Sequence, residues 1–185
     1  MQIAINKESL SVKIKEYKSR RDKITLIPTM GNLHQGHQVL FSKAPSNTVK
    51  IATIYVNPLQ FDDDNDYQNY PKSLQSDLEV CRQNNISLVY VPEGDISRDI
   101  GIEKNIDLPK FTRYLCGQQR EGHFLGVYKI VKYLFSIVNP DFACFGKKDF
   151  QQLLLIKYLA NTYFPKTRII DVDTVRDEKK NSIKL

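Results

Sequence analysis

Cysteine is scarce in this chain, and its distribution argues against two classes of protein. Cys81, Cys116 and Cys144 are the only three cysteines in 185 residues, and they lie far apart in the sequence. An odd number at wide spacing gives neither a disulfide framework nor the paired CxxC ligands of a structural zinc site. We therefore expect reduced thiols in a cytoplasmic protein.

Long apolar stretches are missing as well. Every apolar run is far shorter than the roughly 20 residues that a membrane-spanning helix needs. Residues 1–23 are polar and alternating, and they lack the apolar core of a secretion signal. We expect no membrane partner.

Positive charge is in modest excess but is not concentrated anywhere. The formal net charge is +6, from 27 lysines and arginines against 21 aspartates and glutamates. The basic residues are dispersed, without a basic block or an aromatic RNA-binding motif. We interpret the excess as solvated surface with a few cations available for a triphosphate, and we expect no nucleic-acid partner.

The apolar pattern predicts strands that alternate with helices. Predicted strands cover residues 2–5, 24–27, 49–56, 86–91, 142–145 and 168–172. Predicted helices begin near Ser9, as a cap, and cover residues 37–43, 73–84, 122–138 and 149–161. Residues 59–71 look like a polar loop, and residues 92–121 lack periodicity. The alternation indicates an α/β fold with a mainly parallel sheet, in which ligands bind at the carboxyl ends of the strands.

The stretch from residue 24 to residue 40 carries the strongest local signal. An apolar strand ends at Pro28, a loop with Gly31 and Gly36 follows, and a helix begins near His37. This order aims free backbone N–H groups and a positive helix end at a phosphate. His34 and His37 add hydrogen-bond donors at the same place. By itself such a pair is more often structural, and a zinc site would need further ligands when only His123 remains among the histidines.

A second turn between a strand and a helix has phosphate-binding chemistry. In Gly146-Lys147-Lys148-Asp149 the glycine permits close backbone approach, the lysines supply cations and the aspartate can cap the helix. Taken alone, this is an ordinary capped turn. The acidic run Asp62-Asp63-Asp64 has no EF-hand pattern, so we interpret it as a solvated loop.

Several segments, in order along the chain, resemble one enzyme family. PTMGNLHQGH (28–37), VNPLQF (56–61), YPKSLQSDL (70–78), REGHFLGV (120–127), FGKKDFQQL (145–153) and DTVR (173–176) are similar to motifs of the pantoate–β-alanine ligases. His-x-Gly-His is also the signature of the wider nucleotidyltransferase superfamily. The resemblance implies a Rossmann-like, doubly wound α/β fold with helices on both faces of a mainly parallel sheet.

The resemblance also implies a reaction. Pantoate attacks the α-phosphate of ATP to give pantoyl-adenylate and pyrophosphate, and β-alanine then displaces AMP to give pantothenate. ATP would act with Mg²⁺, no prosthetic group is implied, and relatives form homodimers through this domain.

Site residues follow from the matched positions. The implied catalytic residues are His37, with a proton-donor role, His34 and Lys148. Gln60, Gln152 and Asn57 would bind pantoate, and Asp77 would help to hold Mg²⁺. The implied ATP-binding residues are Met30, Gly31, Asn32, Leu33, His34, Gln35, Gly36, His37, Gly146, Lys147, Lys148, Asp149 and Val175. Arg120 and His123 could line the acid-binding cleft or only organise the turn before a helix.

The sequence departs from the family in a few places. Asn32 and Gln35 stand where relatives usually have alanine and glutamate, Glu121 replaces a proline, and Ser76 replaces a residue that is often acidic. Relatives continue into a Ser-Ser-Arg-Asn loop and a C-terminal domain that closes the site. We expect residues 1–176 to form the ATP- and pantoate-binding domain, residues 177–185 to be a polar tail, and this chain alone to turn over slowly. The alternatives are another nucleotidyltransferase of the superfamily and a nucleotide-binding or dimerisation module.

Overall fold

The fold is built on one parallel sheet, seen in a computed structural model that describes residues 1–94, 96, 99–100 and 106–176. The six strands have the order β1-β4-β3-β2-β5-β6, and every neighbouring pair is parallel. The strands are β1 Gln2–Ala4, β2 Lys23–Thr29, β3 Thr48–Ile54, β4 Leu88–Tyr90, β5 Phe142–Gly146 and β6 Arg168–Val172. The predicted mainly parallel α/β sheet is confirmed.

The chain reverses its direction across the sheet between β2 and β5. From β2 it adds β3 and β4 on one side, and it then returns to place β5 and β6 on the other side of β2. A crevice at the carboxyl ends of the strands is expected at such a switch point.

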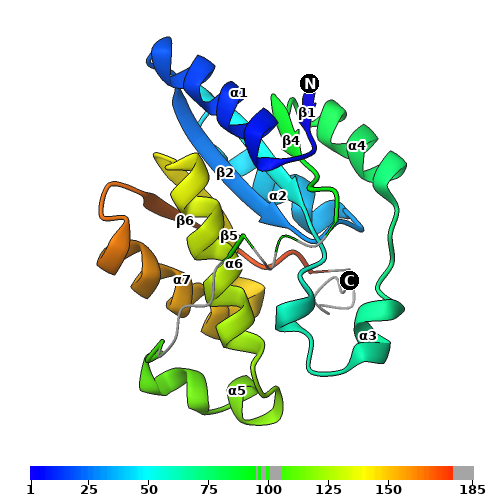
Figure 1. Ribbon diagram of the computed structural model, residues 1–185, viewed down its shortest axis with the longest axis vertical. Coiled ribbons are helices and arrows are strands. Elements are labelled where there is room, and N and C mark those ends of the chain that lie inside the picture. The colour runs from blue at the N-terminus through cyan, green and yellow to red at the C-terminus, as the bar shows by residue number, and fades with distance from the viewer. Residues whose placement is uncertain (95, 97–98, 101–105, 177–185) are drawn as a thin grey trace.

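Helices cover both faces of the sheet (Figure 1). Leu26 of β2 packs in an apolar cluster with α1, α6 and α7, whereas Ile27 packs in a second cluster with α2 and α4. Adjacent residues of a strand face opposite sides, so the two clusters lie on opposite faces. The helices are α1 Lys7–Ser19, α2 Gln35–Lys43, α3 Asp64–Gln68, α4 Leu74–Gln83, α5 Cys116–Gln119, α6 His123–Val138 and α7 Phe150–Tyr163. None of the helices in the described part of the chain is long and apolar enough to cross a membrane.

The first helix begins earlier than predicted. Asn6 is its N-cap and accepts a hydrogen bond from the backbone N–H of Ser9 at 2.8 Å, while the Ser9 hydroxyl accepts from the N–H of Asn6 at 3.2 Å. Ser9 is therefore the third helical residue of a capping box and not the cap.

The segment predicted as a polar loop contains helical turns. The 3₁₀ helix η1, Pro58–Gln60, is capped by Asn57, and α3 is capped by Asp63. Two further 3₁₀ turns are η3, Lys110–Arg113, and η4, Lys147–Asp149. The predicted tail at residues 177–185 lies outside the described residues.

All three cysteines are free thiols. Cys116 is exposed on α5, whereas Cys81 and Cys144 are buried in the cluster on the α2 face. Burial raises the pKa of Cys81 to about 12 and that of Cys144 to about 11. Both buried thiols are therefore protonated at neutral pH.

Candidate active site

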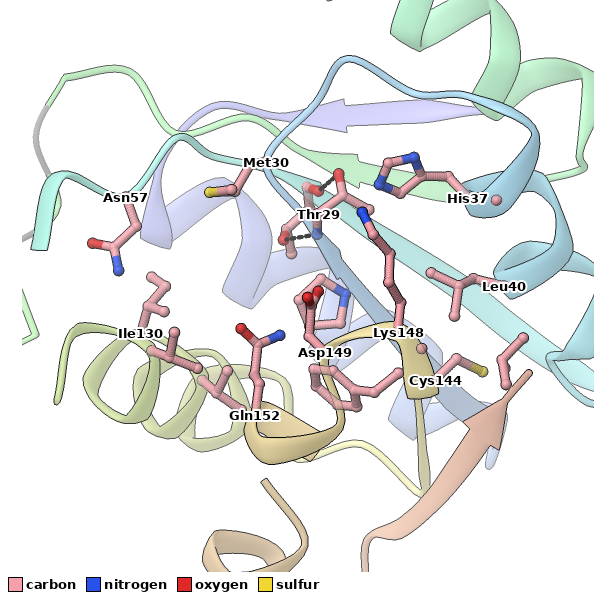
Figure 2. Close-up of a pocket in the computed structure, with 18 of the residues that line it drawn as sticks. Thr29, Met30, His37, Leu40, Asn57, Ile130, Cys144, Lys148, Asp149 and Gln152 are labelled. Carbon is pink, nitrogen blue, oxygen red and sulfur yellow. Dashed lines mark hydrogen bonds between the residues drawn. The ribbon is translucent and has the colours of Figure 1, made fainter. Parts of the chain in front are cut away.

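A cleft opens at the carboxyl ends of β2, β3, β5 and β6, where the chain reverses (Figure 2). Its walls come from the ends of these strands, the start of α2, the 3₁₀ helix η1, one side of α6 and the start of α7. Of the residues predicted from the sequence, those that line it are Met30, His34, Gly36, His37, Asn57, Gln60, Gly146, Lys148, Asp149, Gln152 and Val175. Segments that are far apart in the sequence thus meet where the fold predicts a ligand.

The two histidines stand at the start of α2, and the backbone holds both rings. His34 is the N-cap, and its Nδ1 accepts a hydrogen bond from the N–H of Gly36 at 3.0 Å. Nδ1 of His37 accepts from the N–H of His34 at 3.2 Å. A neutral ring whose Nδ1 is an acceptor carries its proton on Nε2. Each imidazole is therefore held as a neutral Nε2–H donor.

The electrostatics of the cleft favour these neutral rings. Burial, with smaller contributions from His34 and Lys148, lowers the pKa of His37 to about 4. Burial and the nearby Lys148 lower the pKa of His34 as well. The histidines can thus donate hydrogen bonds at neutral pH, and the cationic side chain beside them is Lys148.

The two lysines after β5 have different surroundings. Lys148 lines the cleft and points toward the same space as His37 (Figure 2). Nζ of Lys147 instead bonds Oδ1 of Asp173 at 2.7 Å on the exposed side of the turn. The two cations are adjacent in sequence, but only Lys148 lines the cleft.

The loop before α2 was predicted to point free backbone N–H groups into the cleft. In the structure these groups are bonded within the protein instead. Gly31 donates to Oγ1 of Thr29 at 3.3 Å, and Asn32 and Leu33 donate to the Asp77 carboxylate at 2.9 and 2.7 Å. The N–H groups of His34 and Gly36 bond the imidazoles. An anion bound at this corner would therefore meet chiefly side-chain donors. Gly31, Asn32, Leu33, Gln35 and Lys147 are not among the residues that line the cleft.

Asp77 does not fit the predicted contact with Mg²⁺. Its side chain is 1% exposed, and besides the two backbone groups it accepts a hydrogen bond from Oγ of Ser73 at 3.2 Å. The carboxylate is already satisfied by hydrogen bonds within the protein.

A wall of amides forms the opposite side of the cleft. Asn57 is 1% exposed, and its Nδ2 donates to the carbonyl of Gly126 at 3.1 Å and to Oε1 of Gln60 at 3.2 Å. Gln60 places its Nε2 2.8 Å from the sulfur of Met30. Gln152 points from α7 toward the same space (Figure 2). Asn57 holds η1 in place, whereas Gln60 and Gln152 present amides to the cleft.

His123 supports the amide wall from behind. Its Nδ1 lies 2.7 Å from the carbonyl oxygen of Gln60, an acceptor, so the ring donates from Nδ1. Its side chain is 8% exposed, and burial is the main cause of its lowered pKa. Nε2 of His123 lies 3.5 Å from Arg120, which also pairs with Asp62 at 3.6 Å. Neither His123 nor Arg120 lines the cleft.

The sequence did not reveal the apolar side of the cleft. Val127, Ile130, Val131 and Leu134 of α6 line it, and their helical spacing is equally typical of a stripe that faces the core. Tyr55 and Tyr70 also line the cleft, and neither is among the site residues predicted from the sequence. The α6 stripe serves core and cleft together, which periodicity alone cannot separate.

Comparison with known proteins identifies the family. The model of the pantoate-beta-alanine ligase family matches residues 2–182. The pantothenate synthetase of Aliivibrio fischeri is 42% identical over 171 residues, which are 91% of this chain and 59% of that protein. The pantothenate synthetase of Vibrio atlanticus is 40% identical over 172 residues, 91% of this chain and 58% of that protein. The chain thus spans about three fifths of these curated relatives.

Solved structures agree over the whole chain. The pantoate-beta-alanine ligase of Francisella tularensis, solved in complex with beta-gamma ATP and β-alanine, is 36% identical with a TM-score of 0.92, and the match covers 100% of this chain and 71% of that one. The pantothenate synthetase of Thermus thermophilus is 30% identical with a TM-score of 0.90, covering 100% of this chain and 66% of that one. Together with the match over residues 2–182, this shows that the chain belongs to the pantoate-beta-alanine ligase family.

Proposed function

We propose that this chain carries the site at which ATP activates pantoate in the synthesis of pantothenate. The observation that supports this most strongly is the geometry of the cleft. Neutral donors on His34 and His37 and the cation of Lys148 occupy one side, and the amides of Gln60 and Gln152 occupy the other. A triphosphate and a hydroxy acid need these two kinds of wall.

In the first step, a carboxylate oxygen of pantoate attacks the α-phosphorus of ATP. The bond from that phosphorus to the oxygen bridging the β-phosphate breaks, and pyrophosphate leaves with the electron pair. Negative charge accumulates on the phosphoryl oxygens, where fixed donors lower the barrier electrostatically. We assign this role to Nε2–H of His34 and His37 and to Nζ of Lys148. His37, neutral in the free protein, acts first as a hydrogen-bond donor.

In the second step, the neutral amine of β-alanine attacks the acyl carbon of pantoyl-adenylate. The bond from that carbon to the phosphate oxygen breaks, AMP leaves, and the new amide nitrogen loses a proton to solvent. The related ligase of Francisella tularensis was solved with β-alanine bound, which supports the same second substrate here.

The pantoate end of the cleft combines amides with an apolar wall. Gln60 and Gln152 can bond the hydroxyls and the carboxylate, while Val127, Ile130 and Val131 suit the two methyl groups of pantoate. Val175, just after β6, lines the cleft and is proposed to contact the adenine.

The remaining assignments are proposals by family. ATP enters as its Mg²⁺ complex, with the ion held chiefly by phosphate oxygens, as is usual for this cation. The protein forms a homodimer and acts in the cytoplasm. Residues 1–176 supply the binding floor, and the 185-residue chain tested alone turns over more slowly than a full-length relative, because closure over such a site excludes water.

Two measurements test the proposal. Calorimetric titration of D-pantoate, with and without Mg-ATP, should show binding to this chain and a loss of about tenfold or more in affinity for Gln60→Ala. Gln75→Ala, an exposed glutamine of α4, is the matched control and should bind like the parent.

The second measurement is exchange of labelled pyrophosphate into ATP. Exchange that depends on pantoate supports the adenylation step directly. Pantoate binding without exchange would indicate a binding module instead of an adenylating enzyme. ATP binding that does not respond to pantoate would favour another nucleotidyltransferase.

A further inference from the structure

Asp77 holds a buried carboxylate against the loop that carries the two histidines. We infer that Asp77 is a positioning residue, which fixes the backbone of Asn32 and Leu33 and thereby the start of α2, and that it is not a metal ligand. This role rests on the proposed function only where it concerns ATP. The grip itself is a property of the ligand-free protein.

The grip uses both oxygens of the carboxylate. Oδ2 accepts from the N–H of Asn32 at 2.9 Å, and Oδ1 accepts from the N–H of Leu33 at 2.7 Å. Successive backbone N–H groups converge on one anion only when the chain curls around it. Gly31 and Asn32 supply that curl with φ values of +87° and +49°, in the left-handed region that glycine and asparagine tolerate best.

The loop and the carboxylate are in close contact. A Cβ on Gly31 would lie 2.9 Å from Oδ2 of Asp77 and 3.1 Å from Ile54. Loops of this shape commonly bind phosphate, but here a side chain of the protein already occupies the hollow. The anion is supplied by Asp77 of α4, which lies 44 residues further along the chain than Leu33.

The hydrogen bonds of Asp77 affect the two histidines through the backbone. Leu33 precedes His34, whose own N–H bonds Nδ1 of His37 at 3.2 Å. A shift of the loop would displace that N–H and release the His37 ring from its Nε2–H tautomer. Misplacement of such a donor by about 1 Å can cost a hundredfold in rate.

A metal role would leave different traces. Asp77 is 1% exposed and does not line the cleft, and its carboxylate accepts a third hydrogen bond from Ser73. Direct coordination would compete with these hydrogen bonds, most of all at Oδ1, which already accepts from both Leu33 and Ser73.

The decisive variant is Asp77→Asn, which keeps the shape of the side chain and turns one acceptor into a donor that faces a backbone N–H. Ser73→Ala is the matched control because it removes only the third hydrogen bond, and Glu79→Gln removes an exposed carboxylate of the same helix. In the ligand-free protein we expect the amides of Asn32 and Leu33 to exchange with deuterium about tenfold faster or more in Asp77→Asn, and at parental rates in both controls. The ¹⁵N signals of the His37 ring should move toward a mixture of tautomers.

ATP binding, measured by calorimetry with and without Mg²⁺, separates the two roles. If Asp77 positions the loop, Asp77→Asn lowers the affinities for ATP and for Mg-ATP by the same factor. If only the affinity for Mg-ATP falls, while the amide exchange rates and the ¹⁵N signals of the His37 ring match those of the parent, Asp77 is a metal ligand and the inference is wrong.

The unaltered protein gives a test that needs no variant. Slow exchange of the Asn32 and Leu33 amides, together with NMR signals of these amides that Mn²⁺ alone does not broaden, supports the positioning role of Asp77. Fast exchange of these amides, or broadening of their signals by Mn²⁺, overturns it. These readouts hold even if the chain proves unable to adenylate pantoate, so failure of the proposed function would be recognised separately.

Discussion

Nδ1 of His37 accepts a hydrogen bond from the backbone N–H of His34, so one histidine fixes the proton position of the other. Nδ1 of His34 is fixed in the same way by Gly36. The ring centroids are 4.2 Å apart, so two Nε2–H donors stand together at one corner of the cleft. A pair of this kind can contact two phosphoryl oxygens without a change of protonation.

Stability should fall in acid because of His37. Its pKa in the folded protein, about 4, lies below the ordinary value of 6.5, so the unfolded chain binds the proton more readily. The stabilising contribution is complete above pH of about 6.5 and is lost as the pH falls toward 4. Urea unfolding at pH 7.0, 5.5 and 4.5 measures it.

The matched variant for this test is His37→Asn, whose amide oxygen can replace Nδ1 as an acceptor. It should show a smaller loss between pH 7.0 and 4.5, the remainder coming from His34 and His123, whose pKa values are lowered too. An equal loss in parent and variant would refute the contribution of His37.

His123 should be replaceable by asparagine but not by glutamine. An asparagine amide can occupy the place of Nδ1 and donate to the carbonyl of Gln60, whereas a glutamine amide reaches the place of Nε2, beside Arg120. We expect pantoate affinity to fall about tenfold in His123→Gln and His123→Ala, as for the loss of a net hydrogen bond, and much less in His123→Asn. Calorimetry with pantoate in the presence of Mg-ATP checks this order. Equal effects of asparagine and glutamine would show that the ring acts only by filling space.

Gly126 should not tolerate even one added methyl group. A Cβ there would lie 2.0 Å from the carbonyl oxygen of Leu59, which belongs to η1. We expect Gly126→Ala to lower the free energy of unfolding by about 1–3 kcal/mol and to weaken pantoate binding, because η1 carries Gln60. Ser136→Ala, on the exposed side of the same helix, should change stability by about 0.5 kcal/mol or less. Urea denaturation of both variants provides the comparison, and a fully stable Gly126→Ala that binds pantoate normally would disprove the close contact.

Alanine substitutions of the two neighbouring lysines should have different effects on Mg-ATP affinity. Lys148→Ala removes the cation from the cleft wall, and we expect Mg-ATP affinity to fall about tenfold or more. Lys147→Ala breaks an exposed ion pair with Asp173, a residue at the edge of the cleft. Such pairs contribute little, so affinity should change less than about threefold. Titration of Mg-ATP into both variants measures the difference. Similar losses in the two would mean that charge near the cleft matters but position does not.

Local patterns in the sequence predicted much of the fold. The strand at residues 168–172 was predicted with its observed bounds, and the other strands and long helices were found within a few residues. Their signals are apolar periodicity, proline breaks and caps, all of which are short-range. Motif resemblance supplied the family, which the comparisons confirm.

The errors share a physical cause. Ser9 looked like a cap, but the bond that decides the cap comes from Asn6. The loop before α2 looked like an open phosphate cradle, but Asp77, distant in sequence, fills it. The functions of Asn57 and His123 likewise depend on carbonyls that belong to other segments, Gly126 and Gln60. Which donor meets which acceptor across such separations is decided by packing, and composition does not record it.

The distribution of the thiols has a practical consequence. Cys81 and Cys144 are buried and protonated, so neither offers the thiolate that maleimides and alkylating reagents attack. Cys144 also lies on the cleft wall. Cys116 alone is exposed, on α5 and away from the residues that line the cleft. These 185 residues thus offer a single attachment point for a fluorophore or spin label, which lets ligand-induced movements be followed spectroscopically without engineering any cysteine.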